Sequence, residues 1–284
     1  MRRIHAVLAL CLALVMLAAA SCALAAVKEP QSKTLEASNT YEYDTVKIRI
    51  DQWCWNYGKK DLRFFVADIR TERPEQLLTS FAGDAYSRNS VEAPSAIAQR
   101  RDAVIAINGD YYNYKEDNGT IIRNGVLYRD KKSTRDHLLI DKDGNFSIVF
   151  KKDYQPGMGQ AWIDQGVVQS FVFGPALVND GQVLEMPEKY AISTRDSQRE
   201  PRTAIGQVDT NHYVFVVADG RRNDWSEEGM TLQELAQVCH EAGCRVAFNL
   251  DGGGSTTMVL AGERVNRGST SRERDVSDII YIGK

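Results

Sequence analysis

The chain has 284 residues and a net charge of −3, and its acidic and basic side chains are interspersed along its length. No basic stretch marks a nucleic-acid-binding surface, which excludes that class of function. Because no internal linker, repeat or low-complexity tract interrupts the chain after its first 40 residues, the sequence predicts one large domain.

The N-terminus has the pattern of a secretory signal peptide over residues 1–25. Arg2 and Arg3 precede an apolar run at 6–20, and Ala23 and Ala25 form an A-x-A cleavage site. The apolar run is shorter than the ~20 residues that a membrane-spanning helix needs, so we expect no stable membrane span. We therefore predict a secreted or extracytoplasmic protein.

Cys22 leaves a second form of export open. It follows Ala20 and Ser21 in a stretch that loosely resembles a lipoprotein cleavage box. A lipid anchor on Cys22 is therefore the alternative to plain secretion.

The mature protein is expected to consist of a flexible leader at 26–40 and a folded domain at 41–284. The leader is polar and has almost no bulky apolar residues. Three cysteines remain in the domain, an odd number that permits at most one disulfide bond. Cys239 and Cys244 are the expected pair, and buried free thiols are the alternative.

Alternating apolar residues predict strands in the first half of the domain. Residues 46–50 alternate with a period of two, and a second strand is expected at 62–69. Residues 137–140 and 146–150 flank an Asp-rich turn closed by Gly144, which predicts a hairpin. A further tight turn is expected at 179–181.

One helix is clearly signalled in the second half. Thr231 and Glu234 form a capping box, apolar residues follow at helical spacing, and Gly243 is placed to end the helix. Buried strands are expected before it at 213–218 and after it at 246–250, an order that allows a parallel crossover. Because the hairpins require antiparallel pairing, we predict a single-domain α+β fold with a mixed, largely antiparallel sheet and flanking helices.

Three apolar strands run directly into polar turns that contain glycine. The turns begin at Asn108, Asp219 and Asp251. Strand ends of this kind are where sheet proteins place ligands. The chain also lacks the G-x-S-x-G, H-E-x-x-H and nucleotide-binding glycine signatures, so those enzyme classes are excluded.

The third turn carries three successive glycines, Gly252, Gly253 and Gly254. Glycines permit positive φ angles, so successive N–H groups can converge on an anion such as phosphate. The hydroxyls of Ser255 and Thr256 add donors. A glycine-rich turn shaped by a tight bend alone is the alternative.

Charged residues around these turns suit a phosphate-containing ligand. Arg202 and Arg221 offer guanidinium groups that grip phosphate oxygens in bidentate fashion. Asp110, Asp219 and Asp251 can serve as acid, base or nucleophile, or can hold a hard cation such as Ca²⁺. The sequence spacing leaves these roles open.

Five motifs occur in the order found in one known family. They are Asn108-Gly109-Asp110-Tyr111-Tyr112-Asn113, Arg202-Thr203-Ala204-Ile205-Gly206, Asp219-Gly220-Arg221, Gly229-Met230-Thr231-Leu232, and Asn249-Leu250-Asp251-Gly252-Gly253-Gly254-Ser255-Thr256-Thr257-Met258. In these motifs the chain resembles the phosphodiester glycosidases, the domain family of N-acetylglucosamine-1-phosphodiester alpha-N-acetylglucosaminidase. The resemblance runs from about residue 103 to the C-terminus, where Glu273-Arg274-Asp275-Val276 also fits.

The resemblance implies an exported glycosidase that cleaves a sugar-1-phosphodiester at the anomeric C–O bond, on envelope or exopolysaccharide material. On this hypothesis Asp251, Asp219 and Arg202 are catalytic. The predicted substrate-binding residues are Asn108, Gly109, Asp110, Arg221, Asn249, Gly252, Gly253, Gly254, Ser255 and Thr256. Asp110 stands where many relatives have a glycine, which argues against a direct catalytic role for it.

Two alternatives belong to other classes. One is a non-catalytic envelope module that binds anionic glycans in the same pocket. The other is a metal-dependent phosphodiesterase that breaks the P–O bond.

Overall fold

An eight-stranded antiparallel sheet forms the centre of the protein. The computed structural model describes residues 29–111, 117–186, 189–190, 194–195, 198–221, 227–269 and 272–284. In spatial order the sheet consists of β1 (Ser32–Tyr43), β2 (Val46–Asn56), β3 (Asp61–Thr71), β16 (His212–Ala218), β15 (Arg202–Asp209), β17 (Val246–Leu250), β11 (Ala176–Asn179) and β12 (Gln182–Val183).

Two five-stranded antiparallel sheets accompany the central sheet. The first has the order β7 (Val126–Asp130), β6 (Thr120–Arg123), β10 (Val167–Phe171), β8 (His137–Asp141) and β9 (Phe146–Val149). The second has the order β19 (Glu263–Arg264), β18 (Met258–Leu260), β5 (Ile105–Asn108), β20 (Asp278–Ile282) and β4 (Leu77–Phe81). A separate short pair is formed by β13 (Lys189–Tyr190) and β14 (Thr194–Arg195).

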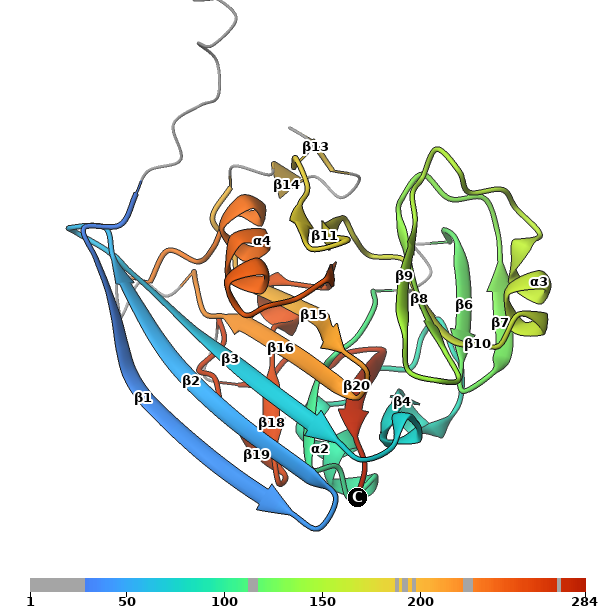
Figure 1. Cartoon of the computed structure of the whole chain (residues 1–284), viewed down its shortest axis with the longest axis horizontal. Helices are drawn as coiled ribbons and strands as arrows, with labels where there is room; N and C mark the ends of the chain where they lie inside the picture. The colour runs from blue at the N-terminus through green and yellow to red at the C-terminus, as the bar shows by residue number, and fades with distance from the viewer. Residues whose placement is uncertain are drawn as a thin grey trace, which may run out of the picture.

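Helices cover the sheets from outside (Figure 1). In the described part of the chain they are α2 (Pro94–Arg100), α3 (Met158–Asp164) and α4 (Leu232–Glu241), with single 3₁₀ turns η1 (Pro74–Gln76), η2 (Ala82–Asp84) and η3 (Gly253–Ser255). The core on one face of the central sheet joins Ile48 and Phe215 to residues of the five-stranded sheets, such as Ile107 and Phe171. The core on the other face packs against α4.

The predicted fold class needs one correction, because the protein is richer in strands than a balanced α+β fold. Every pairing between the described strands is antiparallel. The strands on either side of α4, β16 and β17, run parallel to each other, as the crossover requires, but they are not neighbours in the sheet. β15 lies between β16 and β17 and pairs antiparallel with both.

The hairpins and the capped helix are confirmed. β8 and β9 pair across the turn at Gly144, and β11 and β12 pair across the turn at 179–181. The side chain of Thr231 accepts from the N–H of Glu234, whose own side chain accepts from the N–H of Thr231. Gly243 follows the helix with φ +87°.

The stretch expected to be a flexible leader is paired instead. Most of β1 falls within residues 26–40, and β1 pairs with β2 along its whole length. The side chains of β1 are mostly exposed, so the strand shows none of the apolar alternation that would predict it. Backbone hydrogen bonding at the sheet edge holds it in place.

The expected Cys239–Cys244 disulfide is not present. Cys54, Cys239 and Cys244 are free, and the last two are buried. A side-chain hydrogen bond with Cys244, together with burial, raises the pKa of the Cys239 thiol. The alternative of buried thiols therefore fits this structure.

The export signal at 1–25, Cys22 and residues 26–28 lie outside the described residues. Within the described part of the chain, no helix is long and apolar enough to cross a membrane. Secretion remains a prediction from the sequence.

Candidate active site

The predicted site residues meet at one edge of the central sheet. β16 and β17 end there and β15 begins there, because Arg202 pairs with Ala218 and Thr203 pairs with Leu250. β5 of the neighbouring sheet ends at the same place with Asn108. Segments far apart in the sequence therefore share one location, as their strand-end turns predicted.

Asn108 ties three of these segments together. Its side-chain amide donates to the carbonyl of Asp251 at 2.7 Å, and its Oδ1 accepts from Thr203 Oγ1 at 2.8 Å and from the N–H of Thr257 at 3.1 Å. The side chain is fully buried. Asn108 thus fixes the start of the glycine loop against β5 and β15.

The glycine loop at 252–254 follows β17 and packs very closely against its neighbours. A Cβ on Gly252 would lie 2.7 Å from the carbonyl oxygen of Pro201, and one on Gly254 would lie 3.0 Å from Cδ of Arg274. Gly253 has φ +60°, in the left-handed region. Glycine is therefore required here by close packing as well as by backbone conformation.

The loop does not form the expected nest of N–H groups. The N–H of Gly252 donates to Asp251 Oδ1 at 2.9 Å and that of Gly253 to the carbonyl of Pro201 at 2.8 Å. Those of Ser255 and Thr256 donate back to carbonyls of the loop itself at 3.2 and 3.3 Å. These four N–H groups are used within the protein and are not free to bind an anion.

Two guanidinium groups flank the loop. Nη1 of Arg221 lies 3.3 Å from where a Cβ on Gly253 would be, and the Nε of Arg221 pairs with the buried Glu200. Arg221 is about half exposed, at 52% of its side-chain surface. Arg274 lies against Gly254 and is exposed. Together they place positive charge next to Gly253 and Gly254 of the loop.

The guanidinium group of Arg202 donates to backbone carbonyls outside the glycine loop. It is buried, its Nε donates to the carbonyl of Met230 at 3.0 Å, and its Nη2 donates to the carbonyl of Gln198 at 3.0 Å. These bonds hold the segment before β15, whose Pro201 carbonyl receives the glycine loop. Its observed contacts are those of a positioning residue.

Asp251 has the most unusual acidity of the predicted carboxylates. Burial raises its pKa to about 6, against the lowering effects of a hydrogen bond with Ser255, the charge of Arg274 and the N–H of Gly252. The residue as a whole is nevertheless partly exposed. A carboxyl group with a pKa raised to about 6 suits proton transfer or nucleophilic attack.

Asp219 is fully buried and holds the loop at 266–268. Its Oδ1 accepts from Asn266 Nδ2 at 2.9 Å and from the N–H of Gly268 at 2.7 Å, and its Oδ2 accepts from the N–H of Arg267 at 3.0 Å. Three donors from one loop thus occupy both carboxylate oxygens. This arrangement suits a structural anchor more than a reacting group.

Asn249 lies within β17 and is almost fully buried. Its Nδ2 donates to the carbonyl of Gly174 at 2.6 Å. Its Oδ1 is buried with no hydrogen-bond partner in the structure. The residue therefore ties β17 to the segment before β11.

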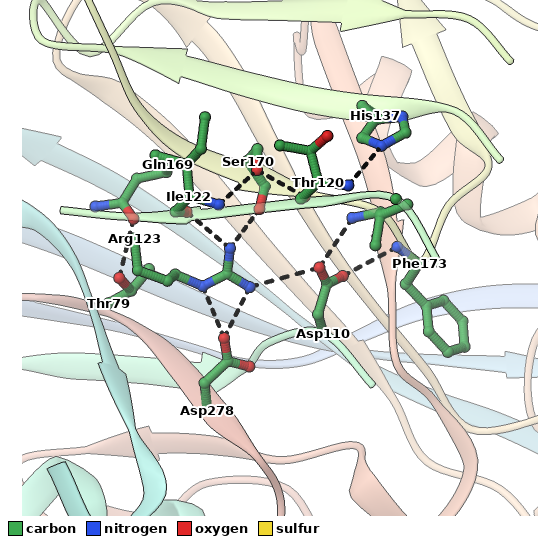
Figure 2. A network of polar contacts seen from close by, with 12 residues as sticks. Thr79, Asp110, Thr120, Ile122, Arg123, His137, Gln169, Ser170, Phe173 and Asp278 are labelled. Atoms are coloured by element: carbon green, nitrogen blue, oxygen red, sulfur yellow. Dashed lines mark hydrogen bonds and ion pairs between the residues drawn. The ribbon is translucent and has the colours of Figure 1, made fainter. Parts of the chain in front are cut away.

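Arg123, Asp110 and Asp278 form a buried ionic cluster, of which the sequence had indicated Asp110 alone (Figure 2). Arg123 lies between Asp278, whose Oδ2 accepts from its Nε and Nη2 at 2.8 Å each, and Asp110, whose Oδ2 is 3.5 Å from Nη2. The ring of Phe171 lies 4.2 Å from the guanidinium carbon. All three charged side chains are at most 2% exposed.

Asp110 is part of this cluster and not of the open site. Its two oxygens accept from the N–H groups of Phe173 and Val172 at 3.0 and 2.9 Å. Burial, helped by the charge of Asp110, raises the pKa of Asp278 to about 7 even though Arg123 lowers it.

Gly109 connects the cluster to the start of the glycine loop. A Cβ on Gly109 would lie 2.3 Å from Asp278 Oδ1, so no larger residue fits. Its carbonyl accepts from the N–H of Asp251 at 3.3 Å. The cluster therefore sets the backbone position from which Asp251 extends.

A model of the phosphodiester glycosidase domain matches residues 101–283, which is most of the folded chain. The chain belongs to the phosphodiester glycosidase family. The matched range contains every predicted site residue and also Arg123, Arg274 and Asp278.

Two curated relatives are similar to parts of this phosphodiester glycosidase. The SPbeta prophage-derived uncharacterized protein YomE of Bacillus subtilis (strain 168) is 29% identical over 204 residues, 69% of this chain and 30% of that protein. The mouse N-acetylglucosamine-1-phosphodiester alpha-N-acetylglucosaminidase is 32% identical over 100 residues, 34% of this chain and 19% of that protein. The chain thus spans less than a third of the length of either relative.

Solved structures share the fold of the phosphodiester glycosidase. The catalytic domain of the zebrafish N-acetylglucosamine-1-phosphodiester alpha-N-acetylglucosaminidase, auto-inhibited by its pro-peptide, has a TM-score of 0.68 at 20% identity, covering 89% of this chain and 88% of that one. A putative exported protein from Burkholderia pseudomallei has a TM-score of 0.53 at 16% identity, covering 78% and 74%. At these identities the likeness establishes the fold alone.

The carboxylates of the candidate site have hydrogen-bond donors of the protein as partners. No group of three or more His, Cys, Asp or Glu side chains in the described ranges could hold a metal ion. Asp110 and Asp219 already accept from five N–H donors. The expectation of a cation such as Ca²⁺ therefore needs an experimental test.

Proposed function

We propose that this phosphodiester glycosidase hydrolyses a sugar-1-phosphodiester at its anomeric C–O bond and releases free sugar and a phosphomonoester. One observation carries the proposal. Asp251, whose pKa is raised to about 6, directly precedes the glycine loop that Arg221 and Arg274 flank. The family membership supports the reaction class. The substrate we propose is envelope or exopolysaccharide material outside the cell.

We assign the roles by what each group touches. Asp251 acts as base or nucleophile toward the anomeric carbon, while Arg221 and Arg274 hold the phosphate oxygens and stabilise the departing phosphomonoester. A phosphomonoester is already a good leaving group, so the reaction needs little proton donation to it. Asn108, Arg202 and Asp219 hold the backbone that carries these groups.

The proposal is tested by product analysis on a small panel of glycosyl-1-phosphodiesters. We expect equal amounts of free sugar and phosphomonoester to appear with time, and the same rates with and without a chelator. Binding of the panel without product would favour the non-catalytic glycan-binding module. Activity that disappears with chelator and returns with Ca²⁺ would favour the metal-dependent phosphodiesterase.

The pH dependence should reveal the state in which Asp251 works. As a base or nucleophile it must be ionised, so kcat/KM should rise about tenfold per pH unit below pH 6 and level off above it, following its pKa of about 6. A rate profile on a substrate with no titrating group measures this. A fall in kcat/KM above pH 6 would instead make Asp251 a general acid.

Removal of the Arg274 guanidinium should weaken substrate binding more than turnover. Because a charge-assisted hydrogen bond to phosphate contributes about 1.5–3 kcal/mol, Arg274→Gln should raise KM at least about tenfold. Arg274→Lys should recover part of the loss, since a lysine keeps the charge but not the bidentate geometry.

Arg245→Gln is the matched control for this prediction. Arg245 is exposed between α4 and β17 and lines a separate hollow with Gln207 and Asp209. Its loss should leave KM unchanged. An Arg274→Gln variant with the KM of the wild-type protein would remove Arg274 from the phosphate site.

A further inference from the structure

A groove of about 230 Å³ lies away from the glycine loop, between the outer strands of the central sheet and the end of α4. It is lined by Trp53 and Trp55 of β2, Phe64 of β3 and Glu241 of α4, with charged residues at its rim. A second hollow of about 250 Å³ shares Lys33, Trp55 and Glu241 with it. The two hollows therefore lie side by side, each large enough for about one sugar ring.

The groove exists because α4 is too short to cover the whole sheet. Alternate residues of β2, such as Ile48 and Ile50, face the main core, so Trp53 and Trp55 stand on the α4 face. The helix has ten residues and packs on β11, β12 and β15 to β17. Figure 1 shows β1, β2 and β3 extending beyond it. The indole of Trp53 is left partly exposed.

Two of the three aromatic rings in the groove lie parallel, whereas Trp55 stands edge-on to Phe64 at 84°. Trp53 and Phe64 are stacked with an interplanar angle of 10° and a centroid distance of 6.5 Å. The Nζ of Lys33 lies 4.1 Å from the Trp55 ring centroid. The flat face of an indole is an apolar surface of the size of a pyranose ring, whose C–H bonds pack against it.

The charges at the rim are largely paired. Arg49 lies 3.2 Å from Asp51 and 3.6 Å from Asp68, and Asp68 also contacts His212 at 3.0 Å. Gln237 donates to Glu241 at 3.1 Å. A rim of paired charges offers both donors and acceptors with little net charge, which suits hydroxyl groups better than phosphate. This contrasts with the exposed guanidinium groups at the glycine loop.

We propose that this groove is a second, non-catalytic glycan site that binds a short run of uncharged sugar rings. The proposal rests on the proposed function, because the sugar rings would belong to the same polymer whose sugar-phosphate linkage is cut at the glycine loop. The groove would hold the polymer to the enzyme between cleavage events. It would leave the hydrolysis of a small soluble substrate unaffected.

The test uses chitotetraose, cellotetraose and maltotetraose, which contain no phosphate. At least one should bind the wild-type protein with a Kd below about 10 mM, measured by isothermal titration calorimetry. Trp53→Ala should weaken that binding about tenfold, because it removes the exposed stacking surface. Tyr128→Ala, which removes an exposed aromatic ring from β7 in another sheet, should not change it. Absence of binding by all three, or equal affinity in Trp53→Ala, would overturn the proposal.

A second variant decides the case where Trp53→Ala fails to fold, which circular dichroism would reveal. Glu241 is exposed at the last position of α4, so Glu241→Gln should fold normally and weaken tetrasaccharide binding about threefold by losing a charged acceptor. Unchanged affinity would overturn the proposal that the groove binds glycans. Hydrolysis of glycosyl-1-phosphodiesters without tetrasaccharide binding would refute the glycan-site proposal but not the proposed function. Tetrasaccharide binding without hydrolysis refutes the proposed function alone.

Discussion

Asp251→Asn should lower kcat/KM on a glycosyl-1-phosphodiester by about 10³-fold or more, because it replaces the group that acts on the anomeric carbon. Asparagine has nearly the same shape, so the hydrogen bonds that surround the loop should persist. Substrate affinity, measured by titration with the inactive variant, should stay within about threefold of the wild-type KM. Asp153→Asn, on the exposed turn after β9, is the matched control and should retain full activity.

The same variant should not lose stability. A carboxyl whose folded pKa of about 6 exceeds its ordinary value of 3.8 binds its proton more tightly in the folded state. Its stabilising contribution is fully present below pH 4 and is lost as the pH rises through 6. At pH 8 the neutral amide should therefore leave the Tm equal or higher. Retained activity would remove Asp251 from the chemistry, whereas a large fall in Tm would make the variant uninformative about catalysis and require Asp251→Ser in its place.

Arg123→Met should cause the largest loss of stability, about 3–5 kcal/mol in the free energy of unfolding. It would leave Asp110 and Asp278 buried side by side without the guanidinium between them. Denaturant unfolding at pH 8 measures the effect. Activity should fall as well, since Asp278 packs against Gly109, which hydrogen-bonds to Asp251.

The pH dependence of this loss identifies its cause. Without Arg123, the pKa of Asp278, already raised to about 7, should rise further, so the carboxyl is protonated and less costly to bury at pH 5 than at pH 8. The destabilisation should therefore shrink on acidification. The double variant Arg123→Met/Asp278→Asn should recover part of the stability at pH 8. A loss that is the same at both pH values would point to lost packing against Phe171 instead.

The location of the site could be predicted because it depends on local sequence. Strands that end in Asn108, Asp219 and Asp251 are visible as apolar runs followed by polar turns. Antiparallel pairing with β15 brings the ends of β16 and β17 to one edge. The capping box of α4 is likewise confined to four adjacent residues.

The roles within the site could not be predicted, because they depend on which way each group points. The glycine N–H groups turn inward to Pro201 and to the loop itself, and Arg202 turns to the carbonyls of Met230 and Gln198. The partners Arg123 and Asp278 are 155 residues apart, and neither belongs to a recognisable motif. Arg274 lay in a segment that fitted the family, yet its contact with Gly254 is a tertiary one.

The most direct test of the account is hydrolysis of a glycosyl-1-phosphodiester in ¹⁸O-water, followed by mass spectrometry of both products. Attack at the anomeric carbon breaks the C–O bond, so we expect one ¹⁸O atom in the released sugar and none in the phosphomonoester. Label in the phosphomonoester and not in the sugar would mean that the P–O bond is cleaved. That result would contradict the assignment of Asp251 to the anomeric carbon.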